Sequence, residues 1–203
     1  MKIVCIGRNY ADHIEELNNE RPKEPVVFIK PDTTIGQYST PFYIPDFSSA
    51  IHHEIELIVR INRIGKHIQE KFASKYYDQI SVGIDFTARD LQAKLKAKGL
   101  PWEKSKSFDG ATILGKWVDK NQFKNLQNLD FELTNNSRVV QKGNTALMLY
   151  TINQLIAHVS QYFTLKIGDV LFTGTPAGVA AVAQEDELEG YLEGQKLFTL
   201  KVK

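Results

Sequence analysis

The amino-acid sequence predicts a mixed α/β fold that is mainly β, with a few helices flanking β-sheets. Short stretches with the composition and alternation of β-strands outnumber the stretches with helical spacing, and the two kinds do not alternate regularly along the chain. This order disfavours a doubly wound parallel sheet. The 203 residues contain no internal repeat, low-complexity tract or linker-like change in composition, so we expect one domain over residues 1–203.

Four strands are expected in the first half of the chain, at residues 2–6, 26–29, 51–61 and 80–85. The alternation is clearest in 51–61, where apolar side chains such as Ile55 and Leu57 share one face. The opposite face carries His52, Glu54 and Glu56. This strand therefore presents carboxylates on one of its faces.

Helical spacing occurs in three places. A short helix is expected at 11–17, and another has Thr87 as its candidate N-cap and Gly99-Leu100-Pro101 as its stop. An amphipathic helix is expected at 146–162, because apolar residues recur there at helical intervals.

The second half of the chain returns to strands, which are expected at 131–134, 138–141, 170–173 and 196–202. The first two flank Asn135-Asn136-Ser137, a sequence typical of a hairpin turn. The last two are connected across the glycine-rich sequence at 173–178. The acidic segment 184–193 is expected to be exposed to solvent.

Composition argues against several functions. Charged residues make up 24% of the chain and the formal net charge is +1, so no overall field attracts a nucleic acid or an anionic membrane. The apolar runs are too short to span a bilayer and the first residues lack the features of a signal peptide, so we expect an intracellular, cytoplasmic protein. Cys5 is the single cysteine, which excludes an internal disulfide and a cysteine-based zinc cluster.

Three acidic residues are candidate metal ligands. Glu54 and Glu56 lie two residues apart on a strand, so their carboxylates emerge from the same face. Alone, such a pair is more often a solvent-exposed acidic face, but Asp85 ends a second apolar strand at a turn into a helix, where a carboxylate often faces a cleft. An all-carboxylate set with open positions suits Mg²⁺ or Mn²⁺ better than Zn²⁺. His52 is a further candidate, either as a ligand or as a hydrogen-bond partner of one.

The helix after Asp85 offers polar side chains beside these candidate ligands. Arg89 and Gln92 lie three residues apart, so they share one helical face and can both point at a ligand held near Asp85. Asp90 falls three residues after Thr87, as in a helix-capping arrangement, and we expect it to have a structural role.

Three further features allow more than one interpretation. His13 and Glu16 share one face of a short helix, where they form either a catalytic dyad that activates water near neutral pH or the polar side of a surface helix. The sequence at 173–178 lacks the lysine of a phosphate-binding loop, so it either presents a hydroxyl and backbone amides to a carboxylate or is an ordinary connection. By composition alone, Lys106 is a surface residue.

Taken in order, six motifs resemble those of the fumarylacetoacetate hydrolase family, in particular its short acylpyruvase and oxaloacetate decarboxylase branch. They span nearly the whole chain, and their joint occurrence is specific although each is weak alone. The motifs are Gly7-Arg8-Asn9-Tyr10-Ala11-Asp12-His13, Phe28-Ile29-Lys30-Pro31, His52-His53-Glu54-Ile55-Glu56-Leu57, Asp85-Phe86-Thr87-Ala88-Arg89-Asp90-Leu91-Gln92, Trp102 with Lys106-Ser107-Phe108-Asp109, and Thr173-Gly174-Thr175-Pro176-Ala177-Gly178-Val179.

The resemblance implies a β-rich sandwich-and-roll fold, a homodimer, and a divalent metal, Mg²⁺ or Mn²⁺, held by Glu54, Glu56 and Asp85. It also implies that His13 and Glu16 lie on a helix that closes as a lid. The residues that it places around the metal-bound substrate are Arg8, Tyr10, Lys30, Arg89, Gln92, Lys106 and Thr175.

On these grounds we expect a divalent-metal-dependent hydrolase or decarboxylase that acts on the C3–C4 bond of small 2-oxo acids through a metal-stabilised enolate. With an acylpyruvate, His13 and Glu16 would activate the attacking water, and Lys106 would help to fix the head group. With oxaloacetate, loss of CO₂ gives the same enolate. Two alternatives stay open: a 2-oxo acid isomerase or hydratase of aromatic catabolism, and a non-catalytic metal-binding dimer.

Overall fold

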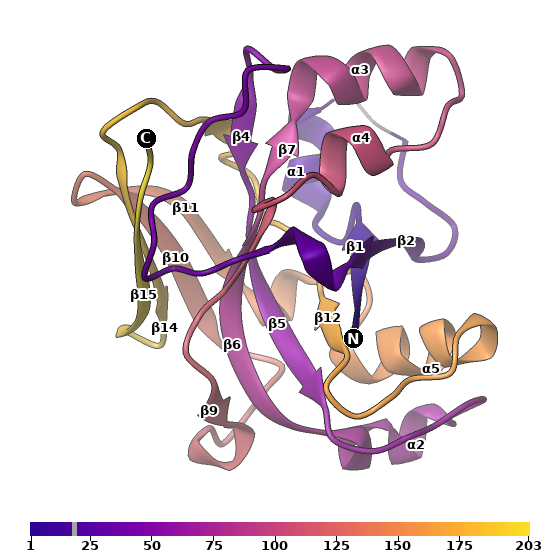
Figure 1. Cartoon of the computed structure of the whole chain (residues 1–203). Coiled ribbons are helices and arrows are strands. Elements are labelled where there is room, and N and C mark those ends of the chain that lie inside the picture. The colour runs from indigo at the N-terminus through magenta and orange to yellow at the C-terminus, as the bar shows by residue number, and fades with distance from the viewer. Residues whose placement is uncertain (18–19) are drawn as a thin grey trace.

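The computed structural model describes residues 1–17 and 20–203, and a mixed sheet of eight strands forms its centre (Figure 1). Seven strands follow the order β2-β1-β12-β5-β6-β8-β3, and β9 also pairs with β6. Their bounds are β1 (Lys2–Gly7), β2 (Val26–Pro31), β3 (Ile35–Gly36), β5 (Ile55–Ile61), β6 (Tyr77–Asp85), β8 (Thr112–Leu114), β9 (Val118–Asp119) and β12 (Val170–Phe172). Because β1 pairs with β12 in parallel and β12 with β5, the motifs at both ends of the chain meet beside β5.

A second, four-stranded antiparallel sheet has the order β11-β10-β14-β15 and lies beside β5 and β6 (Figure 1). Its strands are β10 (Asp130–Asn135), β11 (Arg138–Asn144), β14 (Glu187–Leu192) and β15 (Gln195–Lys201). Leu133 and Leu188 belong to the same buried apolar cluster as Leu57 and Val82 of the large sheet. The main core therefore fills the space between the two sheets, and its burial supplies the main driving force for this arrangement.

A small third sheet joins β4 (Ile51–His53) to β7 (Thr87–Ala88) and β13 (Ala180–Ala181). The strand predicted at 51–61 is therefore two strands in different sheets, β4 and β5, which are separated at Glu54. At this break the backbone N–H of Asp85 donates to the carbonyl oxygen of Glu54 at 2.9 Å. The break and the end of β6 are thus held together.

Helices cover the two ends of the large sheet (Figure 1). They are α1 (Ala11–Glu16), α2 (Glu70–Ala73), α3 (Arg89–Ala97), α4 (Glu103–Lys106) and α5 (Ile152–Tyr162), with 3₁₀ helices at Asp32–Thr34, Ser74–Tyr76, Lys120–Gln122 and Thr145–Leu147. Helices α3 and α4 lie together at one end, and α2 packs against α5 at the other. No helix in the described part of the chain is long and apolar enough to cross a membrane.

Several predicted elements are confirmed. The mixed, mainly β fold class is confirmed, and so is the hairpin of β10 and β11. Its turn residues Asn136 and Ser137 have φ of 50° and 64°, as two-residue hairpin turns require. Helix α3 ends before Gly99, whose φ of 60° suits the position after a helix.

Three local predictions are wrong. The helix expected at 146–162 begins at Ile152, because Thr151 and Gln154 form a capping box there. Thr87 lies in β7 and does not cap α3, whose preceding residue is Ala88. The acidic segment at 184–193 contains strand β14, in which alternate residues such as Leu188 are buried against the other sheet.

Candidate metal centre

Three buried carboxylates converge where the large sheet meets α3. Glu54 lies at the break between β4 and β5, Glu56 lies on β5, and Asp85 ends β6. The antiparallel register of β5 and β6 brings Glu56 opposite Gly83, close to Asp85. One oxygen from each carboxylate lies within 4.8 Å of the others, and the three residues are at most 5% exposed. The predicted convergence of these three side chains is therefore observed.

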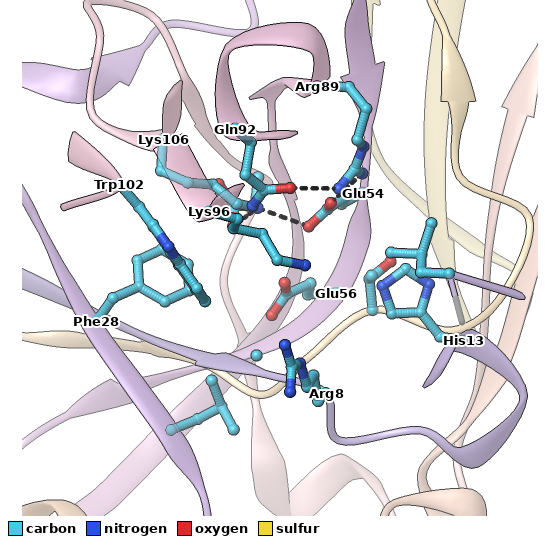
Figure 2. Close-up of a pocket in the computed structure, with 15 residues that line it drawn as sticks. Arg8, His13, Phe28, Glu54, Glu56, Arg89, Gln92, Lys96, Trp102 and Lys106 are labelled. Atoms are coloured by element: carbon cyan, nitrogen blue, oxygen red, sulfur yellow. Dashed lines mark hydrogen bonds and ion pairs between the residues drawn. The ribbon is translucent and has the colours of Figure 1, made fainter. Parts of the chain in front are cut away.

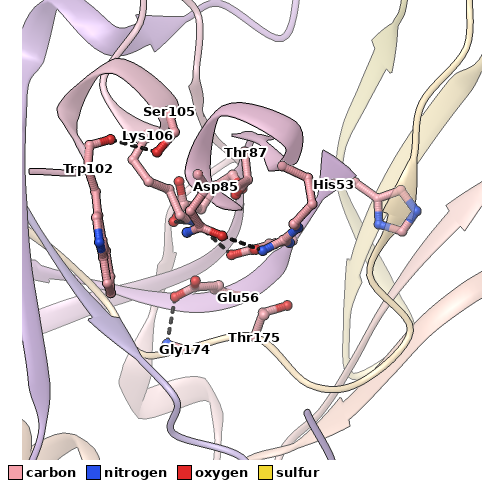
Figure 3. A network of polar contacts seen from close by, with 12 residues as sticks. His53, Glu56, Asp85, Thr87, Trp102, Ser105, Lys106, Gly174 and Thr175 are labelled. Carbon is pink, nitrogen blue, oxygen red and sulfur yellow. Dashed lines mark hydrogen bonds and ion pairs between the residues drawn. The ribbon is translucent and has the colours of Figure 1, made fainter. Parts of the chain in front are cut away.

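Cationic side chains compensate two of the three carboxylates (Figures 2 and 3). Lys106 Nζ donates to Glu54 Oε2 and to Asp85 Oδ2, each at 2.7 Å. Arg89 forms an ion pair with the other oxygen of Glu54. Lys30 Nζ donates to Asp85 Oδ1 at 2.7 Å. Although composition alone predicts surface positions for lysines, Lys30 and Lys106 are buried because each pairs with a buried acid.

The pKa shifts follow from these pairs. Burial alone would raise the pKa of Glu54, but Lys106 and then Arg89 hold that pKa well below its usual value. Burial would likewise lower the pKa of Lys106, whereas Asp85 and Glu54 raise it above its usual value. Both groups are therefore charged near neutral pH.

Glu56 is held differently. The backbone N–H of Gly174 donates to Glu56 Oε2 at 2.6 Å (Figure 3). Burial, followed by the charges of Asp85 and Glu54, raises the pKa of Glu56 well above its usual value. A divalent cation among the three carboxylates would remove this repulsion, and carboxylate oxygens are the ligands that Mg²⁺ and Mn²⁺ accept. The donor set therefore fits a hard divalent cation.

These carboxylates lie in a pocket with a volume of about 50 Å³ (Figure 2). The predicted residues that line it with them are Arg8, His13, Arg89, Gln92, Lys106 and Thr175. Its other lining residues, which sequence reasoning did not assign to the site, are Ile6, Gly7, Leu17, Phe28, Lys96 and Trp102. Because about 10–15 Å³ of such space holds one water molecule, the pocket accommodates a short ligand.

Helix α3 contributes three of the polar lining residues. Arg89, Gln92 and Lys96 have the spacing i, i+3 and i+7, so they share one helical face. Arg89 Nη1 donates to Gln92 Oε1 at 2.8 Å. The same spacing extended by one turn beyond Gln92 would have identified Lys96 from the sequence.

An aromatic pair forms another wall of the pocket. Phe28 of β2 and Trp102, just before α4, pack edge to face with ring centroids 5.8 Å apart. Lys106 Nζ lies 5.4 Å from the centre of the Phe28 ring. The Phe28 ring therefore adds a cation–π attraction to the ion pairs of Lys106.

The His13 and Glu16 side chains interact as predicted from their spacing. His13 Nδ1 lies 3.1 Å from Glu16 Oε2, and His13 is 6% exposed. The other Glu16 oxygen accepts a hydrogen bond from the backbone N–H of Gly178 at 3.0 Å. The glycine-rich connection after β12 thus orients Glu16, which in turn orients a histidine at the pocket wall.

The model of the family described as fumarylacetoacetate (FAA) hydrolase C-terminal matches residues 2–202 of the chain. This chain belongs to the fumarylacetoacetate hydrolase family. An oxaloacetate tautomerase of Escherichia coli, YcgM, is 41% identical over 199 residues, which cover 98% of this chain and 91% of that protein. A mitochondrial oxaloacetate decarboxylase of Dictyostelium discoideum is 41% identical over 182 residues, which cover 89% of this chain and 84% of the relative.

A crystal structure of a family member provides a further comparison. It contains the fumarylpyruvate hydrolase of Pseudomonas aeruginosa in complex with Mn²⁺ and pyruvate. Its TM-score is 0.94 at 28% sequence identity, and the match covers 100% of this chain and 89% of the other. The family and these relatives identify the chain as an enzyme.

Some residues expected around the substrate in this family lie elsewhere. Lys30 and Glu16 are not among the described residues that line the pocket. Lys30 bonds to Asp85 and Glu16 bonds to His13, and both of these partners line the pocket. Tyr10 is also outside the described lining, and its ring packs edge to face against Phe131 at 6.4 Å. Direct substrate contacts of these three residues stay predictions.

Of three further side chains singled out in the sequence, Thr175 and Asp90 have structural partners. Thr175 lines the pocket, but its hydroxyl donates to the carbonyl oxygen of Ile55 at 2.8 Å and accepts from Gln141 Nε2 at 2.9 Å. His52 lies outside the group of three carboxylates. Asp90 has a structural role, but in place of the expected helix cap its carboxylate binds the loop before β4, where it accepts from Ser48 Oγ at 2.6 Å.

Proposed function

We propose that this family member is a divalent-metal-dependent enzyme that interconverts the keto and enol forms of oxaloacetate or a similarly short 2-oxo dicarboxylate. The observation that carries the proposal is the small pocket, which combines three buried carboxylates with a histidine and several cationic side chains. The name of its E. coli relative, an oxaloacetate tautomerase, supports the choice of substrate.

The residues fit Mg²⁺ or Mn²⁺, with Glu54, Glu56 and Asp85 as the ligands. A cation bound there would supply positive charge next to the 2-keto oxygen of the substrate, where the negative charge of an enolate develops. The Mn²⁺ in the P. aeruginosa hydrolase supports a divalent metal in this fold.

The remaining steps belong to the side chains of the chain itself. Lys106 stays charged between Glu54 and Asp85 and can stabilise the enolate oxygen electrostatically. Gln92, oriented by Arg89, offers an amide to the C1 carboxylate. His13 removes or returns the proton at C3, Glu16 stabilises the imidazolium that forms, and the proton on the enol oxygen is exchanged with water.

Cleavage of the C3–C4 bond is a second candidate, because the same enolate forms when that bond breaks. Decarboxylation of oxaloacetate requires no attacking water, whereas hydrolysis of an acylpyruvate requires one. The His13–Glu16 pair favours hydrolysis as an additional activity, since a histidine paired with a carboxylate can activate water. The decarboxylase and hydrolase among the relatives support testing both.

Turnover of defined substrates tests the proposal. The protein is treated with a chelator, reloaded with Mn²⁺ or Mg²⁺, and mixed with enol oxaloacetate, whose ultraviolet absorbance decays as the keto form appears. We expect rapid decay only with metal-loaded protein. In parallel, pyruvate formation is measured from oxaloacetate and from acetylpyruvate, and product analysis with an unsaturated 2-oxo dioate tests the isomerase alternative.

Two results would overturn this assignment. Full activity after complete metal removal would exclude the metal centre, and an absence of turnover with all of these substrates would favour a non-catalytic metal-binding protein. The homodimer implied by the family resemblance stays a prediction, which light scattering during size-exclusion chromatography can test.

A further inference from the structure

Gln141 of β11 makes as many hydrogen bonds as a side-chain amide can make. It is 2% exposed, and it is not among the described residues that line the metal pocket. Its Oε1 accepts from the backbone N–H of Ile55 at 3.1 Å and from His53 Nδ1 at 2.8 Å. Its Nε2 donates to Thr175 Oγ1 at 2.9 Å and to the carbonyl oxygen of Pro176 at 3.0 Å. Both lone pairs and both N–H groups of the amide are therefore used.

Three of these residues form a closed ring of hydrogen bonds. The Ile55 N–H donates to Gln141, Gln141 donates to the Thr175 hydroxyl, and that hydroxyl donates back to the carbonyl oxygen of Ile55 at 2.8 Å. A backbone N–H can only donate, so the Ile55 N–H fixes the orientation of the Gln141 amide. The ring resists displacement, because moving one residue breaks its bonds to the other two.

The ring holds the backbone at two points beside the carboxylate cluster. Ile55 lies between Glu54 and Glu56, so its N–H and carbonyl bonds fix the backbone from which both carboxylates project. Thr175 follows Gly174, whose N–H donates to Glu56 Oε2 at 2.6 Å (Figure 3). A shift at either point would change the separation of oxygens that must all reach one cation.

A β-bulge lies directly before Gln141. Leu133 of β10 pairs with Gln141, but the next residue, Thr134, pairs with Val139, so Val140 is an extra residue in β11. A bulge of this kind bends a strand and re-aims a side chain. It accounts for the way in which a residue of the four-stranded sheet reaches the break between β4 and β5.

The bulge also contacts the segment that orients Glu16. A Cβ atom at Gly178 would lie 2.6 Å from the carbonyl oxygen of Val140 and 3.2 Å from Gln141 Cγ, so this close approach requires glycine. The N–H of Gly178 donates to Glu16 Oε1 at 3.0 Å, and Glu16 contacts His13. Gln141 and the bulge therefore pack against the segment that holds both Glu56 and the His13–Glu16 pair.

We propose that Gln141 is a positioning residue for the metal centre, and that it fixes the separation of Glu54 and Glu56 without contacting the metal or the substrate. The four-stranded sheet then acts on the metal ligands of the large sheet through a single amide. The inference rests on the proposed function, because it assigns the cluster to a divalent metal, but Mn²⁺ affinity tests it without any substrate.

Gln141→Met tests this role, with Ser160→Ala as its control. Methionine has a similar volume but makes none of the four hydrogen bonds, so the buried N–H of Ile55 loses its bond to Gln141. Ser160 is completely buried on α5, and its hydroxyl accepts from the backbone N–H of Ile68 at 2.8 Å. Ser160→Ala removes a comparable bond to a buried N–H, at the end of the large sheet away from α3.

Denaturation and calorimetric titration with Mn²⁺ separate positioning from stability. Both variants should have a lower denaturation midpoint than the wild type, because each loses bonds to buried groups. Gln141→Met should also weaken Mn²⁺ binding by about 10-fold or more, whereas Ser160→Ala should stay within about 2-fold of the wild type. Circular dichroism shows whether each protein is folded at the temperature of the titration.

A milder pair of substitutions at His53 decides the question if Gln141→Met does not fold. His53→Leu removes one donor to the Gln141 amide, while His53→Asn replaces the ring Nδ1–H with an amide N–H in a similar position. We expect His53→Leu to weaken Mn²⁺ binding by about 3-fold or more, and His53→Asn to restore it to within about 2-fold of the wild type.

The role of Gln141 would be refuted if the folded Gln141→Met protein bound Mn²⁺ as tightly as Ser160→Ala, or if the wild type bound no Mn²⁺. Where Gln141→Met does not fold, equal affinities of His53→Leu and His53→Asn would refute it. Failure of the proposed function looks different. In that case the wild type binds Mn²⁺ and the variants keep their order of affinity, but none of the proteins turns over oxaloacetate or acetylpyruvate.

Discussion

The backbone N–H of Gly174 donates to Glu56 Oε2 at 2.6 Å, although the two residues are 118 positions apart. This bond joins the connection after β12 to the carboxylate whose pKa is raised well above its usual value by burial and by the charges of Asp85 and Glu54. Gly174 has φ of 102°, and a Cβ atom there would lie 2.7 Å from Asn9 Cβ. Both the conformation and the close approach therefore require glycine.

Gly174→Ala should destabilise the protein and weaken its metal binding. The added methyl group forces a shift against Asn9 and a conformation that L-residues avoid, which should lower the free energy of unfolding by about 1–3 kcal/mol. Displacing the amide from Glu56 should weaken Mn²⁺ binding by about 10-fold. Chemical denaturation and calorimetric titration measure the two effects.

Gly168→Ala is the matched control for this variant. Gly168 has φ of 87°, but nothing lies within 4 Å of a Cβ built there. Gly168→Ala should lower the free energy of unfolding, because of its backbone conformation, but should leave the affinity for Mn²⁺ unchanged. If both variants weakened Mn²⁺ binding equally, the hydrogen bond to Glu56 would not be the cause.

Glu56→Gln should separate metal binding from stability. The amide keeps an acceptor for the Gly174 N–H but removes a buried negative charge that Asp85 and Glu54 repel. We expect the metal-free variant to be more stable by about 0.5–2 kcal/mol, while Mn²⁺ binding and turnover are lost. Glu187→Gln, at an exposed position of β14, should change neither quantity. Lower stability of Glu56→Gln in the absence of metal would contradict this interpretation.

His13→Ala should affect the proposed reactions unequally. Tautomerisation and acylpyruvate hydrolysis both need a base, so their kcat should fall by about 10²-fold or more, whereas decarboxylation of oxaloacetate should fall much less. Glu16→Gln should show a smaller loss of the same kind, because Glu16 orients His13. Glu15→Gln alters an exposed neighbour and serves as the control. Equal losses in all three assays would refute the role of His13 as the base.

Lys30→Met tests whether Lys30 acts on the substrate or on Asp85. Lys30 is completely buried and bonded to Asp85, so its removal should lower the free energy of unfolding by about 3–5 kcal/mol. Lys196→Met removes the exposed partner of Glu189 and should leave the free energy of unfolding nearly unchanged, as denaturation can show. A stable Lys30→Met protein in which only the KM changes would favour direct contact with the substrate.

Local sequence patterns predicted much of the secondary structure. The alternation at 55–61, the turn residues Asn136 and Ser137, and the glycine after α3 are short-range features, and the structure has the strands, turn and helix end that they predict. The capping box of Thr151 and Gln154 is also a local sequence pattern, and it predicts the observed start of α5 at Ile152.

The candidate site depends both on local sequence spacing and on contacts between distant residues. The spacing of Glu54 and Glu56 and the order of the family motifs identified the three acids and most of the pocket residues from the sequence alone. The burial of Lys30 and Lys106 could not be predicted from composition, which favours surface positions for lysines. Their carboxylate partners are up to 55 residues away along the chain.

The sequence by itself determined which side chains are available to hold a metal and an anionic ligand, and in what order along the chain. Tertiary structure decided which of them meet. The break at Glu54 and the pairing of β1 with β12 and of β12 with β5 arise from strand register and packing between distant segments. Such contacts depend on the whole fold, because local spacing contains no information about the partner of a side chain in another sheet.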